Sequence, residues 1–500
     1  RLLSWQYQNA IADVLGPDAA AATTPLSDVS LNGFDTVGSA SLSLGSSDIE
    51  ALEQNAFAAA QVAVHGSAPQ AWRVCQSSAF DDDGCARAIL AAVGKELYRR
   101  GLADDELARW DGVWSSAAQA YGDFDMGLEF ALAGMLQSPS FVYLVEIGRD
   151  DQGARDRQLT GVELASRLSF FLAGTTPSDD LISAAENGEL DDATGVRLHA
   201  QELLASGRAQ DALHHFFDEK LGLTSALPTV ERPDADLTDA VRGDMRAESL
   251  AFVDDVVWTR NADARELYSG AYTFLNDELA GFYGMPLPGS GAALVKVPLD
   301  PSTHRAGLLT QGAFLARFAH EHRSSPTLRG KYVRESVLCQ AVPAPPMNVN
   351  TTLPEPTASD VPETTRDRMA QHMDTSTTCY GFHSMMDPLG FALEEFDQVG
   401  RFRTHEYGLP INSATTVDGV PVADAIGLES ALHDSDDAPV CLVKNLFRQA
   451  TGHIESDSEE ASLDSIGDEF QNGGYRLQDA LVAIAASDGF RRVALPEGAP

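Results

Sequence analysis

One short stretch of the sequence combines three side chains that bind soft metal ions. Cys379, His383 and Met386 are spaced four and three residues apart. They offer a thiolate, an imidazole and a thioether, the ligand types of a blue-copper site. Such a site also needs a histidine from further upstream, which the sequence supplies at His320, His322 and His372. The pattern makes a mononuclear copper site one hypothesis, whereas the paired spacing of a zinc site is missing.

Other chemical motifs in the sequence are weaker. There is no Gly-x-Ser-x-Gly elbow, no phosphate-binding loop and no His-Glu-x-x-His pattern. His214 and His215 are adjacent on an expected helix, so they face different directions and do not form an i, i+4 ligand pair. The run Asp81–Asp83 offers oxygen ligands for calcium or another cation on the acidic surface, although it lacks the spacing of a calcium loop.

The charge balance of the chain excludes one class of function. The 500 residues include 74 acidic and 35 basic side chains, a formal net charge of −39. A nucleic-acid binder is therefore not expected, because phosphate groups would be repelled. With 44% hydrophobic residues the chain is expected to bury several packed modules. No run of 18 apolar residues occurs, so no transmembrane segment is predicted.

The spacing of the cysteines indicates in which cellular compartment the protein is expected. Cys75 and Cys85 bracket a short loop, a spacing that suits a local disulfide and hence an oxidising environment. Two unrelated buried thiols are the alternative. The opening residues Arg1–Trp5 lack the features of a cleavable signal, so any signal peptide is absent from this sequence. We expect a periplasmic or extracellular protein, a setting in which an acidic surface is also common.

Helical periodicity dominates the sequence. Apolar residues recur every three or four positions in residues 3–15, and Gly16-Pro17 should end that helix. A capping pattern at Thr160 and Glu163 opens another helix. Further helices are predicted over residues 49–64, 83–98, 192–204, 209–221, 239–258, 365–373, 440–450 and 476–486.

The remaining segments are expected to be irregular. Residues 19–48 are predicted to form a loop, and prolines between Pro326 and Pro362 interrupt any continuous helix. Asp387-Pro388-Leu389-Gly390 predicts a rigid turn directly after His383. A short β-like hairpin is expected around Asp418-Gly419. The predicted fold class is mostly α: multidomain helical bundles with a long Pro-rich irregular segment and one hairpin near the C-terminus.

Strings along the whole chain resemble one family. They are Arg1–Gly16, Ser138–Glu146, Leu164–Leu172, Gly307–Gln311, Ser325–Lys331, Met386–Asp397, Gly400–Arg403 and Ser487–Arg491. In these strings the chain resembles the planctomycete-type cytochrome c family, exported bacterial proteins built from consecutive domains of unknown function. The predicted modules are residues 1–70, 71–152, a central helical bundle at 153–295, a Pro-rich and cytochrome-like segment at 296–410, and a C-terminal helical module at 411–500.

The resemblance implies a haem site. Similar proteins carry Cys-x-x-Cys-His, which attaches haem by two thioethers and supplies an axial imidazole. This chain reads Cys379-Tyr380-Gly381-Phe382-His383, which implies attachment by a single thioether at Cys379 with His383 as the proximal ligand. A second axial ligand is then expected among His320, His322, His372, Met385 and Met386, and Arg329 is a candidate partner for a haem propionate.

The resemblance also implies how the cysteines pair. A sixth cysteine at position 382 would complete three pairs, with Cys75 joined to Cys85 and Cys339 joined to Cys441. Because Phe382 stands there, Cys379 is left single. Its expected uses are a thioether, a metal ligand or an alternative disulfide to Cys339 or Cys441; a buried free thiol is the other reading.

The sequence thus predicts an exported haem-dependent redox protein that transfers electrons to a partner protein or oxidises an external substrate. One alternative is a cofactor-free scaffold of the same family, in which Phe382 fills the space beside His383. The other is the copper site at Cys379, His383 and Met386. Haem is preferred to copper because blue-copper proteins are small β-sandwiches, whereas this chain is helical.

Overall fold

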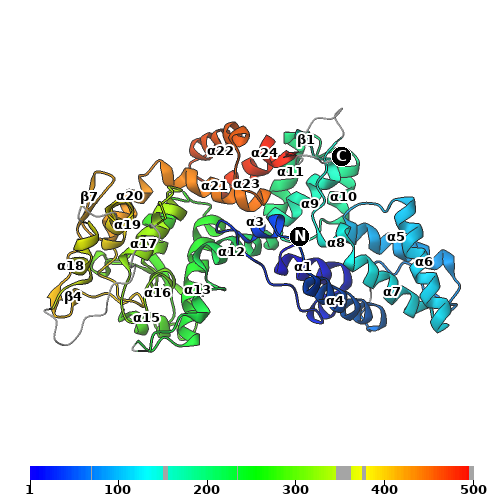
Figure 1. Ribbon diagram of the computed structural model, residues 1–500, viewed down its shortest axis with the longest axis horizontal. Helices are drawn as coiled ribbons and strands as arrows, with labels where there is room; N and C mark the ends of the chain where they lie inside the picture. The colour runs from blue at the N-terminus through cyan, green and yellow to red at the C-terminus, as the bar shows by residue number, and fades with distance from the viewer. Residues whose placement is uncertain are drawn as a thin grey trace. The chain divides into compact units, whose positions relative to one another are not determined.

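The computed structural model describes residues 1–68, 70–149, 156–233, 235–344, 362–373, 375 and 379–494 (Figure 1). These residues contain 24 α-helices, and their strands pair only in antiparallel twos. The predicted mostly α fold is confirmed. The expected linker at 149–153 lies, apart from its first residue, outside the described residues, as does the Pro-rich segment from 345 to 361. Within the described residues no helix is long and apolar enough to cross a membrane.

The chain divides into two compact units. The first consists of Arg1–Leu213, Leu446–Ile466 and Leu481–Pro500, and the second of His214–Asn445 and Gly467–Ala480. The boundaries fall inside four helices: α12 (Gly207–Leu221), α21 (Asp437–Thr451), α22 (Glu460–Asn472) and α23 (Leu477–Ala486). The five modules expected from the sequence remain a prediction.

The first unit is helical, with one short sheet. Helix α1 ends where Gly16 adopts a φ of +96°, and α9 begins with the predicted capping box of Thr160 and Glu163. Strands β1 and β8 pair antiparallel. The elements are α1 (Ser4–Leu15), α2 (Pro17–Ala21), α3 (Asp35–Ser41), α4 (Ser46–His65), α5 (Asp83–Tyr98), α6 (Asp104–Tyr121), α7 (Phe124–Gln137), α8 (Pro139–Val142), β1 (Asp156–Gln158), α9 (Gly161–Leu172), α10 (Asp179–Glu186), α11 (Ala193–Leu204), η7 (Asp457–Glu459), α24 (Asp488–Arg491) and β8 (Arg492–Ala494).

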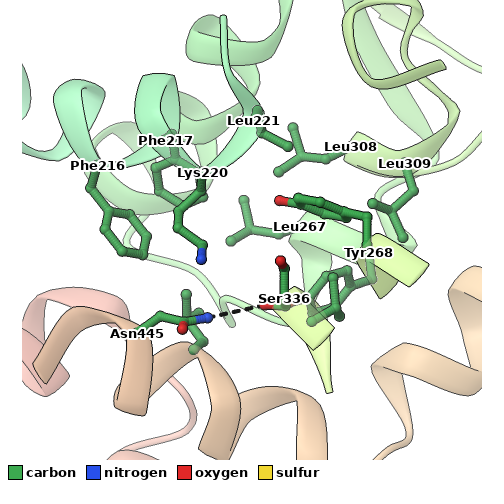
Figure 2. Close-up of a pocket in the computed structure, with 13 residues that line it drawn as sticks. Phe216, Phe217, Lys220, Leu221, Leu267, Tyr268, Leu308, Leu309, Ser336 and Asn445 are labelled. Atoms are coloured by element: carbon green, nitrogen blue, oxygen red, sulfur yellow. Dashed lines mark hydrogen bonds between the residues drawn. The ribbon is translucent and has the colours of Figure 1, made fainter. Parts of the chain in front are cut away.

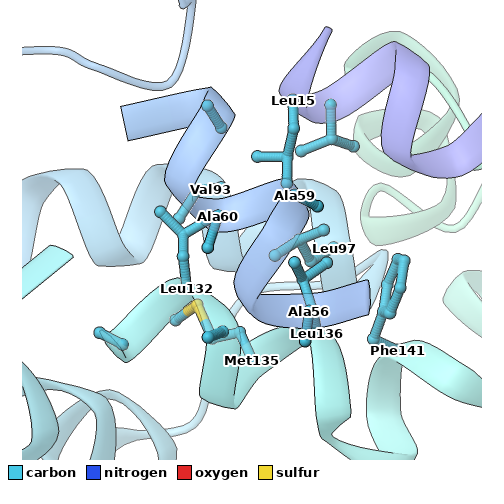
Figure 3. Packing of buried hydrophobic residues seen from close by; sticks show 14 of the residues in the cluster. Leu15, Ala56, Ala59, Ala60, Val93, Leu97, Leu132, Met135, Leu136 and Phe141 are labelled. Atoms are coloured by element: carbon cyan, nitrogen blue, oxygen red, sulfur yellow. The ribbon is translucent and has the colours of Figure 1, made fainter. Parts of the chain in front are cut away.

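Small side chains on α4 allow the helices of the first unit to pack closely around its core. Ala56, Ala59 and Ala60 are fully buried, and Figure 3 shows them among larger side chains of neighbouring helices, such as Leu132 and Leu136 of α7. Alanine lets helix axes approach, and the facing leucines fill the remaining space. At the edge of this core Cys75 and Cys85 form the disulfide expected from their spacing.

The second unit combines helices with three two-stranded antiparallel sheets, β2–β3, β4–β5 and β6–β7. Asp418 and Gly419 both have positive φ and form the predicted turn between β6 and β7. The elements are η1 (Leu227–Thr229), α13 (Asp239–Asp254), η2 (Asp255–Thr259), α14 (Glu266–Ser269), β2 (Tyr272–Leu275), α15 (Asp277–Tyr283), β3 (Val295–Pro298), η3 (Pro301–Thr303), η4 (Leu308–Thr310), α16 (Gly312–Arg317), α17 (Pro326–Tyr332), η5 (Val333–Val337), α18 (Thr365–Met369), η6 (Ala370–Met373), α19 (Tyr380–Phe391), β4 (His405–Glu406), β5 (Leu409–Pro410), β6 (Thr415–Val417), β7 (Val420–Val422) and α20 (Ala425–His433).

Helices α17 and α19 pack backbone against backbone. A Cβ atom added at Gly330 would lie 1.9 Å from the carbonyl oxygen of Met386, and one added at Gly390 would lie 1.8 Å from that of Pro326. Only glycine permits this approach, so each helix supplies a glycine where the other helix's main chain passes. The pair forms the support on which Cys379 and His383 are mounted.

Two sequence predictions are corrected by these elements. The expected turn at Asp387-Pro388-Leu389-Gly390 is helical, because α19 continues through Pro388 to Phe391. A proline within a helix removes one backbone hydrogen bond, and here packing of α19 against α17 compensates. The expected loop over residues 19–48 contains α3 and part of α2, two short helices whose apolar faces are too small to give a periodic pattern.

A buried carboxyl group ties α13 to its neighbours. Glu248 is 1% exposed and accepts hydrogen bonds from the hydroxyls of Thr273, at 2.5 Å, and Tyr283, at 2.7 Å. Burial is the main cause that raises the pKa of Glu248 from 4.5 to about 7. Folded protein therefore keeps this proton at pH values where an unfolded chain releases it.

The glycine contact between α17 and α19 makes a testable prediction. Gly390→Ala should destabilise the protein by about 2 kcal/mol or more, because the added methyl collides with the main chain at Pro326. Gly381→Ala is the matched control on the same helix, since nothing lies within 4 Å of the added atom, and it should be neutral or stabilising. Equal thermal melting points for the two variants would contradict the proposed contact.

The buried carboxyl group of Glu248 predicts that the stability of the protein depends on pH. Since its pKa is higher in the folded state, its contribution to stability falls as pH rises from about 4.5 to about 7. The glutamine of Glu248→Gln does not titrate. From pH 5 to pH 8 the free energy of unfolding of the variant, relative to that of the parent protein, should therefore increase by an amount on the order of 2–3 kcal/mol, as measured by denaturant unfolding. A stability difference that is the same at both pH values would contradict the raised pKa.

Candidate functional site

Helix α19 aligns the residues singled out by the sequence. Cys379 is its N-cap residue, and His383, Met386 and Asp387 follow at helical spacing on the same side. His383 is 9% exposed, Met386 is 4% exposed and Asp387 is fully buried. The helix forms because apolar residues recur along this side and bury it against α17. Cys379 and His383 are thus held one turn apart, as a haem-attachment sequence requires.

A buried carboxylate fixes the imidazole of His383. Its Nδ1 lies 2.8 Å from Oδ2 of Asp387, while Oδ1 of Asp387 accepts a hydrogen bond from the hydroxyl of Thr327 at 2.9 Å. A carboxylate only accepts, so Nδ1 of His383 carries the proton and the lone pair is left on Nε2. This carboxylate–histidine arrangement is typical of imidazoles that bind a metal. In the described part of the chain Nε2 has no hydrogen-bond partner.

Two aromatic rings contact the imidazole of His383. The ring of His372, from η6, lies 4.5 Å away between centroids at an angle of 30°, and the ring of Phe382 lies 4.7 Å away at 38°. Burial, followed by the neighbouring His383, lowers the pKa of His372. Its Nδ1 is buried and makes no hydrogen bond with any described residue. His372 lies beside His383, so the two rings do not face each other across the space of an iron atom.

The cysteines divide as four bonded and one free. The structure joins Cys75 to Cys85 and Cys339 to Cys441, and it leaves the thiol of Cys379 free and half-buried. An alternative disulfide from Cys379 is therefore not formed. Among the described residues Cys379 does not share a cluster of three His, Cys, Asp or Glu ligand atoms, so a preformed thiolate metal site of that kind is not assembled around it.

The other predicted ligands are placed elsewhere. His320 and His322 are exposed on the turn between α16 and α17, which the bridge between Ala319 and Ser324 closes. Met386 is buried beside His383 on α19. His214 pairs with Asp254 at 2.7 Å, as a structural histidine would. Asp82 caps α5 by accepting a hydrogen bond from the amide of Cys85 at 3.1 Å, and calcium at this run stays a prediction.

Arg329 does not reach the site as a propionate partner. It is fully buried, and burial lowers its pKa to about 10. Its guanidinium donates to four main-chain carbonyl groups, those of Leu315, Leu393, Phe396 and Asp397. The expected propionate partner assumes an exposed guanidinium group, the ordinary state of arginine. Its observed role is to hold the chain after α19 against α16 and α17.

Asp387 is the site residue that sequence reasoning missed. The sequence places Asp387 in an expected turn directly after His383 and gives its side chain no contact with the imidazole. On a helix, residues four apart face the same way, so His383 and Asp387 would have been recognised as a pair had α19 been extended through Pro388. Thr327 left no signal, because its contact with Asp387 depends on how α17 packs against α19.

A separate pocket lies in the second unit. Its volume is about 490 Å³, including the part open to solvent, and Figure 2 shows a mainly apolar lining with the side chains of Lys220 and Asn445 among it. The amide of Asn445 donates to the carbonyl of Ser336 at 3.0 Å, next to the disulfide of Cys339. Neither Cys379 nor His383 lines this pocket. The lining comes from segments far apart in sequence, and no pattern pointed to it.

Comparison with known sequence families covers nearly all of the chain. Each of five consecutive segments matches a family described as Protein of unknown function: residues 1–65 (DUF1587), 85–146 (DUF1595), 159–285 (DUF1592), 305–406 (PSCyt3, DUF1588) and 418–490 (DUF1585). This order decides the relationship. The chain belongs to the planctomycete-type cytochrome c family. No curated protein and no solved structure matches it. In this family member, Cys379, His383 and Asp387 all lie within the PSCyt3 segment.

The number of free thiols in this planctomycete-type cytochrome c family protein can be measured in solution. Of its five cysteines four are in disulfides, so haem-free protein unfolded without reductant should react with one equivalent of a thiol reagent. Cys379→Ser should reduce this to zero, whereas Ser336→Ala, next to the Cys339 disulfide, should leave it at one. Three reactive thiols in the parent protein would show that one disulfide is not formed.

Proposed function

We propose that this protein is an exported redox protein that holds one haem through a single thioether at Cys379, with His383 as an axial ligand. The observation that carries the proposal is the imidazole of His383, which Asp387 fixes at Nδ1, one turn after a free thiol; its Nε2 has no hydrogen-bond partner among the described residues. These residues fit one thioether and one axial imidazole. They do not fit the two-thioether attachment, because Phe382 replaces the second cysteine.

Each residue has a separate task in this proposal. Cys379 anchors the group, His383 binds the iron, and Asp387 keeps the imidazole in the required tautomer. Thr327 holds Asp387 in place through its hydroxyl. A haem held in this way supplies one-electron chemistry. Membership of a cytochrome-like family supports the assignment, and the two disulfides support an oxidising compartment outside the cytoplasm.

The net charge of the chain indicates what kind of partner protein it would bind. A net charge of −39 favours association with a protein that presents a basic face. A redox partner of this kind would exchange electrons at the PSCyt3 segment. Electrostatic association of this type weakens as salt is added, because exposed charges are screened.

A second candidate function is supported by Phe382. Its side chain is 9% exposed and its ring packs against that of His383, so it fills space that a second thioether would need. In this case the protein is a cofactor-free scaffold whose acidic surface binds partners. The copper hypothesis has less support, since Cys379 belongs to no three-residue ligand cluster of described His, Cys, Asp and Glu.

The deciding experiment is an absorption spectrum and intact mass of protein from an exporting host that has cytochrome c maturation enzymes. We expect a Soret band and a mass increased by one haem, with the colour retained after acid extraction. Cys379→Ser should lose covalent attachment and His383→Ala should lose the native spectrum. His65→Ala, which removes an exposed histidine paired with Glu129 in the first unit, should change neither.

Restoring the missing cysteine tests the same site by gain of function. Phe382→Cys recreates Cys-x-x-Cys-His and should give two thioethers, which shifts the visible absorption bands of the haem. A colourless protein of unmodified mass, from a host that matures a control cytochrome, would reject the haem proposal and favour the scaffold. An intense visible thiolate band with one copper per chain would instead establish the copper site.

A further inference from the structure

Three side chains from separate segments of the second unit converge on one point. His304 follows η3, Glu395 lies in the turn after α19, and Asp424 is the N-cap residue of α20. One ligand atom from each lies within 4.8 Å of the other two, and no other such group of His, Cys, Asp and Glu occurs among the described residues. The cluster shares no residue with the Cys379 and His383 site.

The contacts within this cluster are not those of ordinary hydrogen bonds. Nδ1 of His304 lies 3.2 Å from Oε2 of Glu395 and 3.7 Å from Oδ2 of Asp424. Both Nδ1 of His304 and Oε2 of Glu395 are buried, yet neither makes a hydrogen bond of acceptable geometry with a described residue. Buried polar atoms are normally paired. The ligand atoms of the three side chains lie close enough together for one metal ion to contact all of them.

The surrounding structure fixes two of the three groups. The imidazole of His304 stacks on the ring of Phe402, with centroids 4.5 Å apart and an angle of 18°. Oδ1 of Asp424 accepts a hydrogen bond from the amide of Gly427 at 2.9 Å, which leaves Oδ2 for the cluster. The side chains of His304, Glu395 and Asp424 are 31%, 15% and 27% exposed, so small solutes can reach them while their geometry is restrained.

The charges in the cluster also favour a cation. Arg403, close in sequence, is not available for neutralisation, because its guanidinium pairs with Glu394 at 3.5 Å and Glu406 at 3.3 Å. An ion of charge +2 would balance both carboxylates and accept the lone pair of the imidazole.

We propose that His304, Glu395 and Asp424 bind a divalent transition-metal ion such as Zn²⁺. One imidazole nitrogen and two carboxylate oxygens suit zinc and its neighbours better than calcium, which prefers oxygen ligands alone. Three protein ligands leave a coordination position for water. The bound ion would join the segments at residues 304, 395 and 424, so it would stabilise the second unit independently of any haem.

Calorimetric titration of Zn²⁺ into the full chain tests the site, with haem-free, metal-stripped protein that carries no polyhistidine tag. The parent should bind one ion and melt at a higher temperature. Asp424→Asn keeps the helix cap and Glu395→Gln keeps the volume, so both should fold; each should weaken binding by more than about tenfold. Circular dichroism checks that the variants remain folded.

Two control variants make the result specific. Glu459→Gln alters another carboxylate–histidine pair, with His453 at 2.8 Å, and His383→Ala removes the proposed haem ligand. Both should bind Zn²⁺ as the parent does, which separates this site from the one at Cys379. No binding to the parent, equal binding to Asp424→Asn and Glu395→Gln, or a preference for Ca²⁺ over Zn²⁺ would each overturn the proposal.

Discussion

The contact between α17 and α19 is the constraint on which the candidate site depends. Gly330 and Gly390 let the two main chains touch, and any side chain at either position would separate them. The short distance brings Thr327 of one helix to Asp387 of the other, and Asp387 in turn orients His383. A path of hydrogen bonds therefore runs from a helix contact to an imidazole. The orientation of His383 therefore depends both on its sequence neighbour Asp387 and on the helix packing that brings Thr327 to Asp387.

Buried arginines perform a related task elsewhere in the fold. Arg99, Arg305 and Arg329 are buried and direct their guanidinium groups to main-chain carbonyls. Such carbonyls, left without partners at helix ends and turns, would be costly to bury. One planar group with five donors satisfies several of them at once. Since these guanidinium groups are buried, they serve the packing of the main chain and are not available to a partner at the surface.

The sequence was sufficient to predict structural features that depend on residues close together in the chain. Periodic apolar residues located α1, α5 and α9, and Asp418-Gly419 located the hairpin of β6 and β7. It was insufficient where contacts are made over long distances. Pro388 was read by its usual preference, but packing keeps it within α19. Arg329 is expected from the sequence to bind a haem propionate, but its guanidinium binds main-chain carbonyls. The cluster of His304, Glu395 and Asp424 joins segments that no spacing rule connects. Local propensity is a weak guide when tertiary packing opposes it.

The division of the chain also has a consequence for biosynthesis. The first compact unit includes residues near both ends of the sequence, and its strand β1 pairs with β8, which ends at Ala494. Arg167 likewise donates to the carbonyl of Phe490. The amino-terminal half cannot therefore complete its structure until residues 490–494 have been synthesised. A truncation before residue 490 would therefore leave the first unit without strand β8 and without the carbonyl group that Arg167 binds, although most of that unit is made much earlier.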